Sequence, residues 1–277
     1  MATTSGEKTI LGKIVEARRE SIAHRKRVLP EVALKIAAQK AEPPRDFAGA
    51  LTRGAYNVIA ELKKASPSRG IIREDYHPAA LAPKLEAAGA AALSVLTEEE
   101  FFLGSLAHLK EVKKVTQIPI LRKDFIVDAW QVWETRAAGA DTFLLIAASL
   151  DDALLGELLE LGHSLRMEPL VEVHSREELE RVIAAGAKII GVNNRDLRDF
   201  EVRLETSLEL IETIPDDCIA VSESGLNTHA DLAGLRAAGF DAFLVGETVM
   251  KAEDPGEPLR ALIGGEGSAG PKGRPRA

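Results

Sequence analysis

The sequence has little of several residue types on which common functions depend. Its 277 residues include one cysteine, Cys218, and six histidines, and aromatic residues make up 4% of the chain. A single cysteine permits no internal disulfide, which fits a reducing compartment. The sparse histidines show no spacing typical of metal ligands, so we expect neither a metal nor another cofactor.

Long apolar runs and an excess of positive charge are also missing. No apolar run approaches the roughly 18 residues that span a membrane, and residues 1–8 lack the apolar core of a signal peptide. The net charge of −8 argues against a nucleic-acid partner, although a local cationic pocket for a small anion remains compatible with it. We therefore expect a cytoplasmic protein that binds neither nucleic acid nor a membrane.

What the sequence does have is a long alternation of strands and helices. It follows a lead-in of two amphipathic helical stretches, near 8–27 and 31–41. Apolar segments typical of buried strands then occur at 57–63, 91–97, 118–124, 141–147, 168–174, 188–193, 218–223 and 242–246.

This alternation predicts an α/β fold, a single (β/α)8 TIM barrel with an N-terminal helical extension. Eight strand–helix units favour a closed barrel over an open doubly wound sheet, and no glycine-rich dinucleotide fingerprint follows the first strand. We expect residues 1–48 to form the helical extension packed on the barrel and residues 49–263 to form the barrel. Residues 264–277 are poor in apolar side chains and are expected to be disordered.

Polar side chains gather at the ends of six of the expected strands. In a barrel of this kind, chemistry belongs at the C-terminal ends of the strands. A charge on an apolar strand is costly unless it is partnered, so the convergence favours a catalytic or ligand site over packing. On the first strand alone, a structural salt bridge explains the charges equally well. The residues at these ends are Glu61, Lys63, Arg122, Lys123, Asp124, Glu172, Asn193, Arg195, Glu223, Ser224, Gly225, Gly246 and Glu247.

The last two strand ends predict a phosphate site. Ser224-Gly225 and Gly246-Glu247 lie where such barrels bind phosphate through backbone N–H groups and a short helix N-terminus. Glycine suits this position because a Cβ would block the oxyanion, and tight turns are the alternative explanation. Since the carboxylate of Glu247 would repel an anion, we expect its side chain to point away.

The remaining strand-end residues suit acid–base chemistry. Lys63 and Lys123 enclosed by one wall would repel each other, which predicts a lowered pKa for at least one of them. The neighbouring glutamates would balance this charge, and one of them could act as a base. His174 shares the strand face of Glu172, but a lone histidine at this place is interpreted as structural.

Together these segments resemble the indole-3-glycerol phosphate synthase family. Ala60-Glu61-Leu62-Lys63 followed by Ser66-Pro67-Ser68 is similar to the first-strand signature of that family. The resemblance covers nearly the whole chain, including the helical lead-in, and leaves out only the glycine-rich tail. It continues through Leu96-Thr97-Glu98, Lys123-Asp124-Phe125, Val171-Glu172-Val173, Asn193-Asn194-Arg195-Asp196-Leu197, Ser222-Glu223-Ser224-Gly225 and Val245-Gly246-Glu247.

The resemblance implies the ring-closing step of tryptophan synthesis. In that step 1-(2-carboxyphenylamino)-1-deoxyribulose 5-phosphate loses carbon dioxide and water to give indole-3-glycerol phosphate. By resemblance Lys123 is the general acid at the ketone oxygen, and Glu172 is the base that removes the ring proton. Lys63, held by Glu61, would bind the carboxylate and assist dehydration. Which lysine protonates which oxygen stays open.

Further residues take roles by the same resemblance. Asn193, Arg195 and Glu223 would orient the substrate and its hydroxyl groups, and Ser224 is expected among the catalytic residues. The residues expected to bind the substrate are Ser66, Pro67, Phe102, Phe125, Arg195, Gly225, Gly246 and Glu247. Among these Pro67, Phe102 and Phe125, with Ile146, would form a slot for the anthranilate ring, and plain packing explains them equally well. Glu247 departs from relatives with a small hydroxyl residue there, which puts a side-chain contact to phosphate in doubt.

The expected partner is thus a small phosphorylated molecule with an aromatic carboxylate, and the family allows a weak association with other tryptophan-pathway enzymes. Two alternatives remain at this stage. Another phosphate-binding barrel, such as phosphoribosylanthranilate isomerase, would not require Glu61 and Lys63 together with Lys123 and Glu172. A barrel that only holds a phosphorylated ligand would explain the glycines but not three buried carboxylates.

Overall fold

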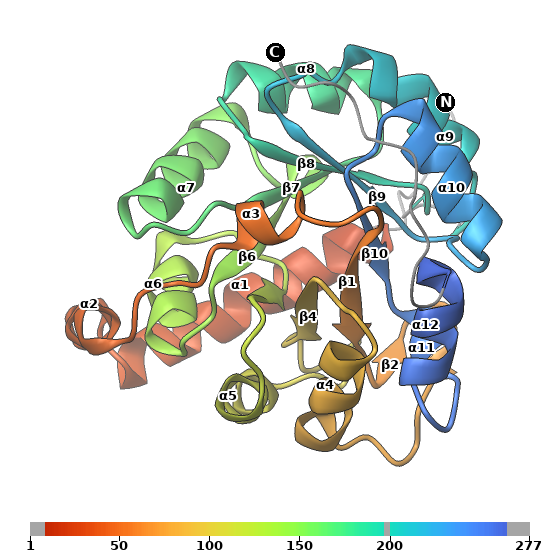
Figure 1. Cartoon of the computed structure of the whole chain (residues 1–277). Coiled ribbons are helices and arrows are strands. Elements are labelled where there is room, and N and C mark those ends of the chain that lie inside the picture. Colours follow the sequence, from red (N-terminus) through yellow and green to blue (C-terminus); the bar gives the residue numbers. More distant parts are fainter. Residues whose placement is uncertain (1–8, 197–199, 265–277) are drawn as a thin grey trace, which may run out of the picture.

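Eight parallel strands close into a barrel in the computed structural model, which describes residues 9–196 and 200–264 (Figure 1). The predicted (β/α)8 fold is confirmed, and each strand lies within its predicted segment. Around the barrel the strands follow the chain order, and the last pairs with the first. They are β1 (Asn57–Leu62), β4 (Ala92–Leu96), β5 (Ile120–Lys123), β6 (Thr142–Ile146), β7 (Leu170–Val173), β8 (Ile189–Asn193), β9 (Ile219–Glu223) and β10 (Ala242–Val245).

Helices connect successive strands and cover the outside of the barrel (Figure 1). Side chains that cap the first turns fix several of the helix starts, as where Thr228 and Asp231 form a reciprocal capping box. The helices are α4 (Pro78–Ala87), α5 (Leu106–Val115), α6 (Ala129–Ala137), α7 (Asp152–Ser164), α8 (Arg176–Ala184), α9 (Glu205–Leu210), α10 (His229–Ala238) and α12 (Gly256–Ile263).

Several short elements are not predicted by the repeat pattern, because each is too short for its periodicity to repeat along the sequence. Helix α9 continues directly into a 3₁₀ turn at Ile211–Thr213, and another 3₁₀ turn spans Ala147–Ser149. The remaining short elements are α3 (Phe47–Ala50), the antiparallel pair β2 (Ala65–Ser66) and β3 (Gly70–Ile71), and α11 (Glu247–Met250).

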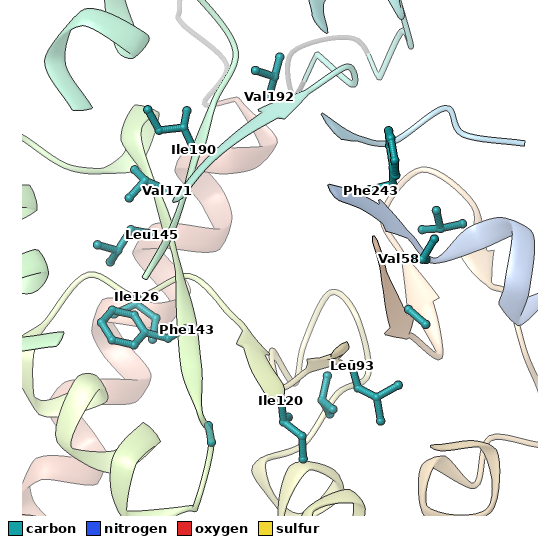
Figure 2. Close-up of a cluster of buried hydrophobic side chains, with 14 of the residues drawn as sticks. Val58, Leu93, Ile120, Ile126, Phe143, Leu145, Val171, Ile190, Val192 and Phe243 are labelled. Atoms are coloured by element: carbon teal, nitrogen blue, oxygen red, sulfur yellow. The ribbon is translucent and has the colours of Figure 1, made fainter. Parts of the chain in front are cut away.

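The alternation of side chains along each strand divides the core into two layers. Val58, Leu145 and Val171 belong to the layer between strands and helices, part of which is shown in Figure 2. Residues of the opposite parity, such as Ile59 and Ile189, fill the barrel interior. This parity decides which strand-end side chains enter the barrel, so it also decides the composition of the site.

The N-terminal helices pack on this barrel. Helix α1 (Ile10–Val28) crosses one end of the barrel, while α3 lies at the opposite end (Figure 1). Helix α2 (Glu31–Lys40) packs against α6. Within the described ranges, each helix is too short or too polar to cross a membrane. The tail expected to be disordered lies, from residue 265 onward, outside the described residues.

Candidate active site

Inward-facing side chains from five strands meet at the C-terminal mouth of the barrel. Glu61, Lys123, Glu172, Asn193 and Glu223 occupy the last inward positions of β1, β5, β7, β8 and β9. All five line one cavity. Alternate residues along each strand face the barrel interior, and this alternation brings together polar groups that lie at separate strand ends in the sequence.

Lys123 lies at the centre of the charge arrangement. Its Nζ is 3.0 Å from Glu172 Oε2 and 3.4 Å from Glu223 Oε2. Burial opposes the charged ammonium, but the charges of Glu172, Glu223 and Glu61 outweigh burial and raise the pKa of Lys123. At Lys123 the shift is thus opposite to the one expected from repulsion by Lys63. The prediction asks for a lowered pKa at one of the two lysines, and Lys123 is not that lysine, because three carboxylates outweigh the charge of the second lysine.

The two glutamates that flank Lys123 are in different protonation states near neutral pH. Burial, together with the charges of Glu172 and Glu61, raises the pKa of Glu223 to about 8. Burial also acts on Glu172, but Lys123, His174 and the Asn193 amide, which donates to Glu172 Oε1 over 3.0 Å, lower its pKa. Paired carboxylates whose pKa values are pushed apart are typical of sites that hold an acid and a base. Glu172 is the ionised partner.

Lys63 is paired with Glu61 at the end of β1, with 3.1 Å between Nζ and Glu61 Oε1. The Glu61 carboxyl group packs directly over Gly246, where an added Cβ would lie 2.9 Å from Oε2. Gly191 has the same relationship to Glu223, since a Cβ there would lie 2.1 Å from Oε1. These glycines make room for buried carboxylates, a role at Gly246 separate from the predicted approach of an anion. A glycine inside a strand is a signal of such close approach.

A second cavity adjoins the first at the ends of β9 and β10. Lys63, Arg195 and Ser224 line both cavities, and Gly225 and Gly246 line the second. Ser224 and Gly225 both have a positive φ, of 68° and 79°. The residues predicted for anion binding are thus gathered beside the acid–base groups.

Glu247 does not point away from this second cavity, contrary to the prediction. Its carboxylate lies on the cavity wall, 2.6 Å from Lys251 Nζ, 3.2 Å from Arg69 Nε and 3.5 Å from Arg195 Nη2. Burial favours the neutral acid, but the hydrogen bond and charge of Lys251, with the two arginines, lower the pKa of Glu247. The charges of these three cations stabilise the ionised carboxylate at a place where it would otherwise repel a bound anion.

One wall of the first cavity is apolar. The rings of Phe102 and Phe125 lie 5.9 Å apart and are tilted by 39°. Three residues of this wall that the strand ends do not reveal are Leu11 and Ile14 of α1 and Phe200. The helical apolar stripe of the lead-in is the signal for the first two. The predicted residues that also line this cavity are Ser66, Pro67 and Ile146.

Arg122 belongs to a different place. As an outward-facing residue of β5 it is completely buried behind the barrel, where Nη2 lies 2.9 Å from Asp124 Oδ2 and 3.0 Å from Glu134 Oε2. Arg18 of α1 binds the same Asp124 through Nε and Nη2, at 2.9 and 2.5 Å. Arg18 is a missed residue, although it lies four residues from both Ile14 and Ile22 and so shares their buried helical face.

Several solved structures share the fold of this chain. The barrel resembles the 3-hexulose-6-phosphate synthase of Salmonella typhimurium, with a TM-score of 0.60, 13% identity, and coverage of 74% of this chain and 96% of that chain. It also resembles a tryptophan synthase α-subunit of Pyrococcus furiosus, with a TM-score of 0.59, 14% identity, and coverage of 77% and 99%. At these identities the likeness concerns the fold alone.

Comparison of sequences, unlike comparison of folds, identifies the family of this chain. Indole-3-glycerol phosphate synthases of Burkholderia multivorans and Burkholderia ambifaria are each 48% identical over 258 residues, covering 92% of this chain and 98% of theirs. The family model described as indole-3-glycerol phosphate synthase matches residues 11–262. The chain therefore belongs to the indole-3-glycerol phosphate synthase family.

Proposed function

We propose that this chain is a carboxy-lyase of tryptophan biosynthesis that closes the indole ring of 1-(2-carboxyphenylamino)-1-deoxyribulose 5-phosphate with loss of carbon dioxide and water. Family membership supports the reaction. The observation that carries the assignment of roles is the position of Lys123 between Glu172 and Glu223, beside a cavity lined by Gly225 and Gly246.

Lys123 is the general acid of this proposal. Its ammonium is kept protonated by the surrounding carboxylates, and it faces the cavity rather than solvent. A charged donor at this place would polarise the ketone oxygen while the aromatic ring attacks the carbonyl carbon. Lys63, with Glu61 beside it, would bind the substrate carboxylate before carbon dioxide leaves.

Glu172 is the general base. Its carboxylate is ionised and hydrogen-bonded by Asn193, so it is oriented before the substrate arrives. Glu223, which carries a proton near neutral pH, can donate a hydrogen bond to a substrate hydroxyl. Asn193 also accepts from the backbone N–H of Arg195, which links the base to a residue that lines the second cavity.

The substrate groups match the two cavities. The phosphate would bind in the second cavity, to backbone N–H groups near Ser224, Gly225 and Gly246 and to Arg195. The anthranilate ring would lie on the wall formed by Phe102 and Phe125. Here α1 would close the site from above, since Leu11 and Ile14 line the same cavity.

Two finer points belong to this proposal. A cytoplasmic location is supported by the presence of one cysteine, the free Cys218, because a chain without an internal disulfide fits a reducing compartment. A weak association with other enzymes of the tryptophan pathway is supported by the family alone.

The test is direct. Purified protein mixed with the carboxyphenylamino substrate should give the fluorescence of an indole, and the product should be released with one equivalent of carbon dioxide. Binding of the substrate with no indole fluorescence would contradict the proposal and favour a barrel that only holds a phosphorylated ligand. Glu172→Gln serves as the matched inactive variant, because it keeps the shape of the base and removes its charge.

A further inference from the structure

His174 lies directly behind the ionised carboxylate of the site. It follows β7 on the same strand face as Glu172, and its Nε2 is 3.4 Å from Glu172 Oε1. Its side chain is 16% exposed. The sequence interpretation treats this histidine as structural, and the established family roles used above do not involve it.

The imidazole is fixed on its other side by Glu178 of α8. Nδ1 is 3.5 Å from Glu178 Oε2, and the same oxygen accepts a 2.7 Å hydrogen bond from the backbone N–H of His174. Ser175, the N-cap of α8, accepts from the backbone N–H of Glu178 over 3.3 Å. The ring is therefore held between two carboxylates, one in the active site and one at the start of a helix.

The Nε2 atom makes no hydrogen bond to any described residue, although it is buried. A buried ring nitrogen without a hydrogen-bond partner costs free energy of folding, so its presence calls for an explanation. The nearest polar group is the Glu172 carboxylate, so the nitrogen is directed at the base and not at the scaffold. An orphaned atom that faces a reactive group indicates a functional contact.

His174 also lines a polar cavity between the ends of β7 and β8, which adjoins the substrate cavity at Leu11 and Asn193. Acidic groups outnumber basic ones around the ring. Burial lowers the pKa of His174, but the hydrogen bond and charge of Glu178 and the charges of Glu172 and Glu223 raise it above the ordinary value. The other ionisable groups on this cavity are Arg176, Glu177, Asp196, Glu201, Arg203 and Glu209.

We propose that the protonated imidazole of His174 is a positioning residue for Glu172, which it holds ionised and turned toward the substrate through an ion pair at Oε1. The inference rests on the proposed role of Glu172 as the base. Lys123 occupies Oε2 and Asn193 shares Oε1, so His174 supplies the second positive charge. In this arrangement the base is tuned from outside the substrate cavity.

The first test needs no turnover. Nitrogen-15 NMR titration of the histidine rings, with His174 assigned by its loss in His174→Gln, should show His174 titrating above the ordinary histidine value. Both Glu172→Gln and Glu178→Gln should lower the pKa of His174, because each removes one of the flanking charges. A His174 resonance that titrates normally and ignores Glu172→Gln would overturn the proposal, whatever the fate of the proposed reaction.

The second test separates positioning from packing. His174→Ala should lower kcat about tenfold and leave KM within about twofold, because His174 does not line the substrate cavity. Added imidazole should restore kcat more at about pH 6 than at about pH 8.5, since imidazolium is the active form. An unchanged kcat, or a rescue that grows with pH, would contradict the proposal. His163→Ala is the control, because His163 pairs with Glu168 at 2.9 Å on the surface of α7.

Discussion

Arg18 of the N-terminal helix and Asp124 form a two-point ion pair, 2.9 and 2.5 Å long, next to the central lysine of the site. Both side chains are buried, and Thr97 and Arg122 bind the same carboxylate. Asp124 directly follows Lys123 in the chain, so α1 is joined to the backbone that carries the proposed general acid. The lead-in is thus part of the site as well as a cover for it.

Arg18→Ala should lower the free energy of unfolding by about 3 kcal/mol, because it leaves a buried carboxylate with one of its two cations missing. Urea unfolding followed by circular dichroism measures this. Arg19→Ala, at an exposed neighbouring position, should change the stability by less than about 0.5 kcal/mol. Equal losses in the two variants would show that the ion pair adds nothing to stability.

The pKa of Glu223 makes stability depend on pH. Because burial raises it to about 8 in the folded chain, from an ordinary value of 4.5, the stabilising contribution is complete below pH 4.5 and is lost as the pH rises toward 8. Glu223→Gln removes a charge that the folded state disfavours. The variant should therefore have a higher Tm than the native chain at about pH 8.5 and nearly the same Tm at about pH 4.5. Its turnover should fall about 100-fold.

The matched control for that experiment is Glu111→Gln, which changes an exposed carboxylate on α5. It should show no such pH-dependent gain. A Glu223→Gln variant that is less stable than the native chain at high pH would mean that Glu223 is ionised in the folded state and well paired. The assignment of a protonated carboxyl at this place would then fail.

Glu247 weakens the predicted anion site. Its carboxylate neutralises Arg69, Arg195 and Lys251, so Glu247→Gln should release these cations and strengthen the binding of inorganic phosphate about threefold to tenfold. Isothermal titration calorimetry at low ionic strength measures this, and added salt should reduce the difference.

Glu253→Gln, at an exposed position beyond the site, should leave phosphate binding unchanged. Weaker binding in Glu247→Gln would show a different role for this residue. The carboxylate would then be needed to hold Arg195 in a productive orientation.

The repeat of strands and helices could be predicted from the sequence because apolar periodicity is a local property. Strand parity extends this to the site, since it places Lys123 and Glu172 on the same inner face from separate strands. Local patterns do not contain contacts between distant segments, and this is why the pairing of Arg18 with Asp124 and the packing of Glu61 over Gly246 were missed. The same limit explains why the raised pKa of Lys123 was not predicted, since it depends on carboxylates from three other strands.

Gly191 is a second case in which a contact with a distant segment cannot be read from the local sequence. A glycine inside β8 is visible in the sequence, but its purpose appears only when Glu223 of β9 is seen to occupy the space of its missing side chain. Gly191→Ala should therefore displace the Glu223 carboxyl group and lower kcat about tenfold or more, while the barrel still folds. Steady-state kinetics with a thermal melt checks this. Full activity would mean that Glu223 can shift without loss.

The central claim is that Lys123 performs the acid step of ring closure. It is tested most directly by single-turnover indole fluorescence of Lys123→Ala at saturating substrate, beside Lys110→Ala on the exposed face of α5. We expect Lys123→Ala to fold and bind the substrate but to form indole at least about 1,000-fold more slowly, whereas Lys110→Ala should react normally. Indole formation at the native rate in Lys123→Ala would contradict it.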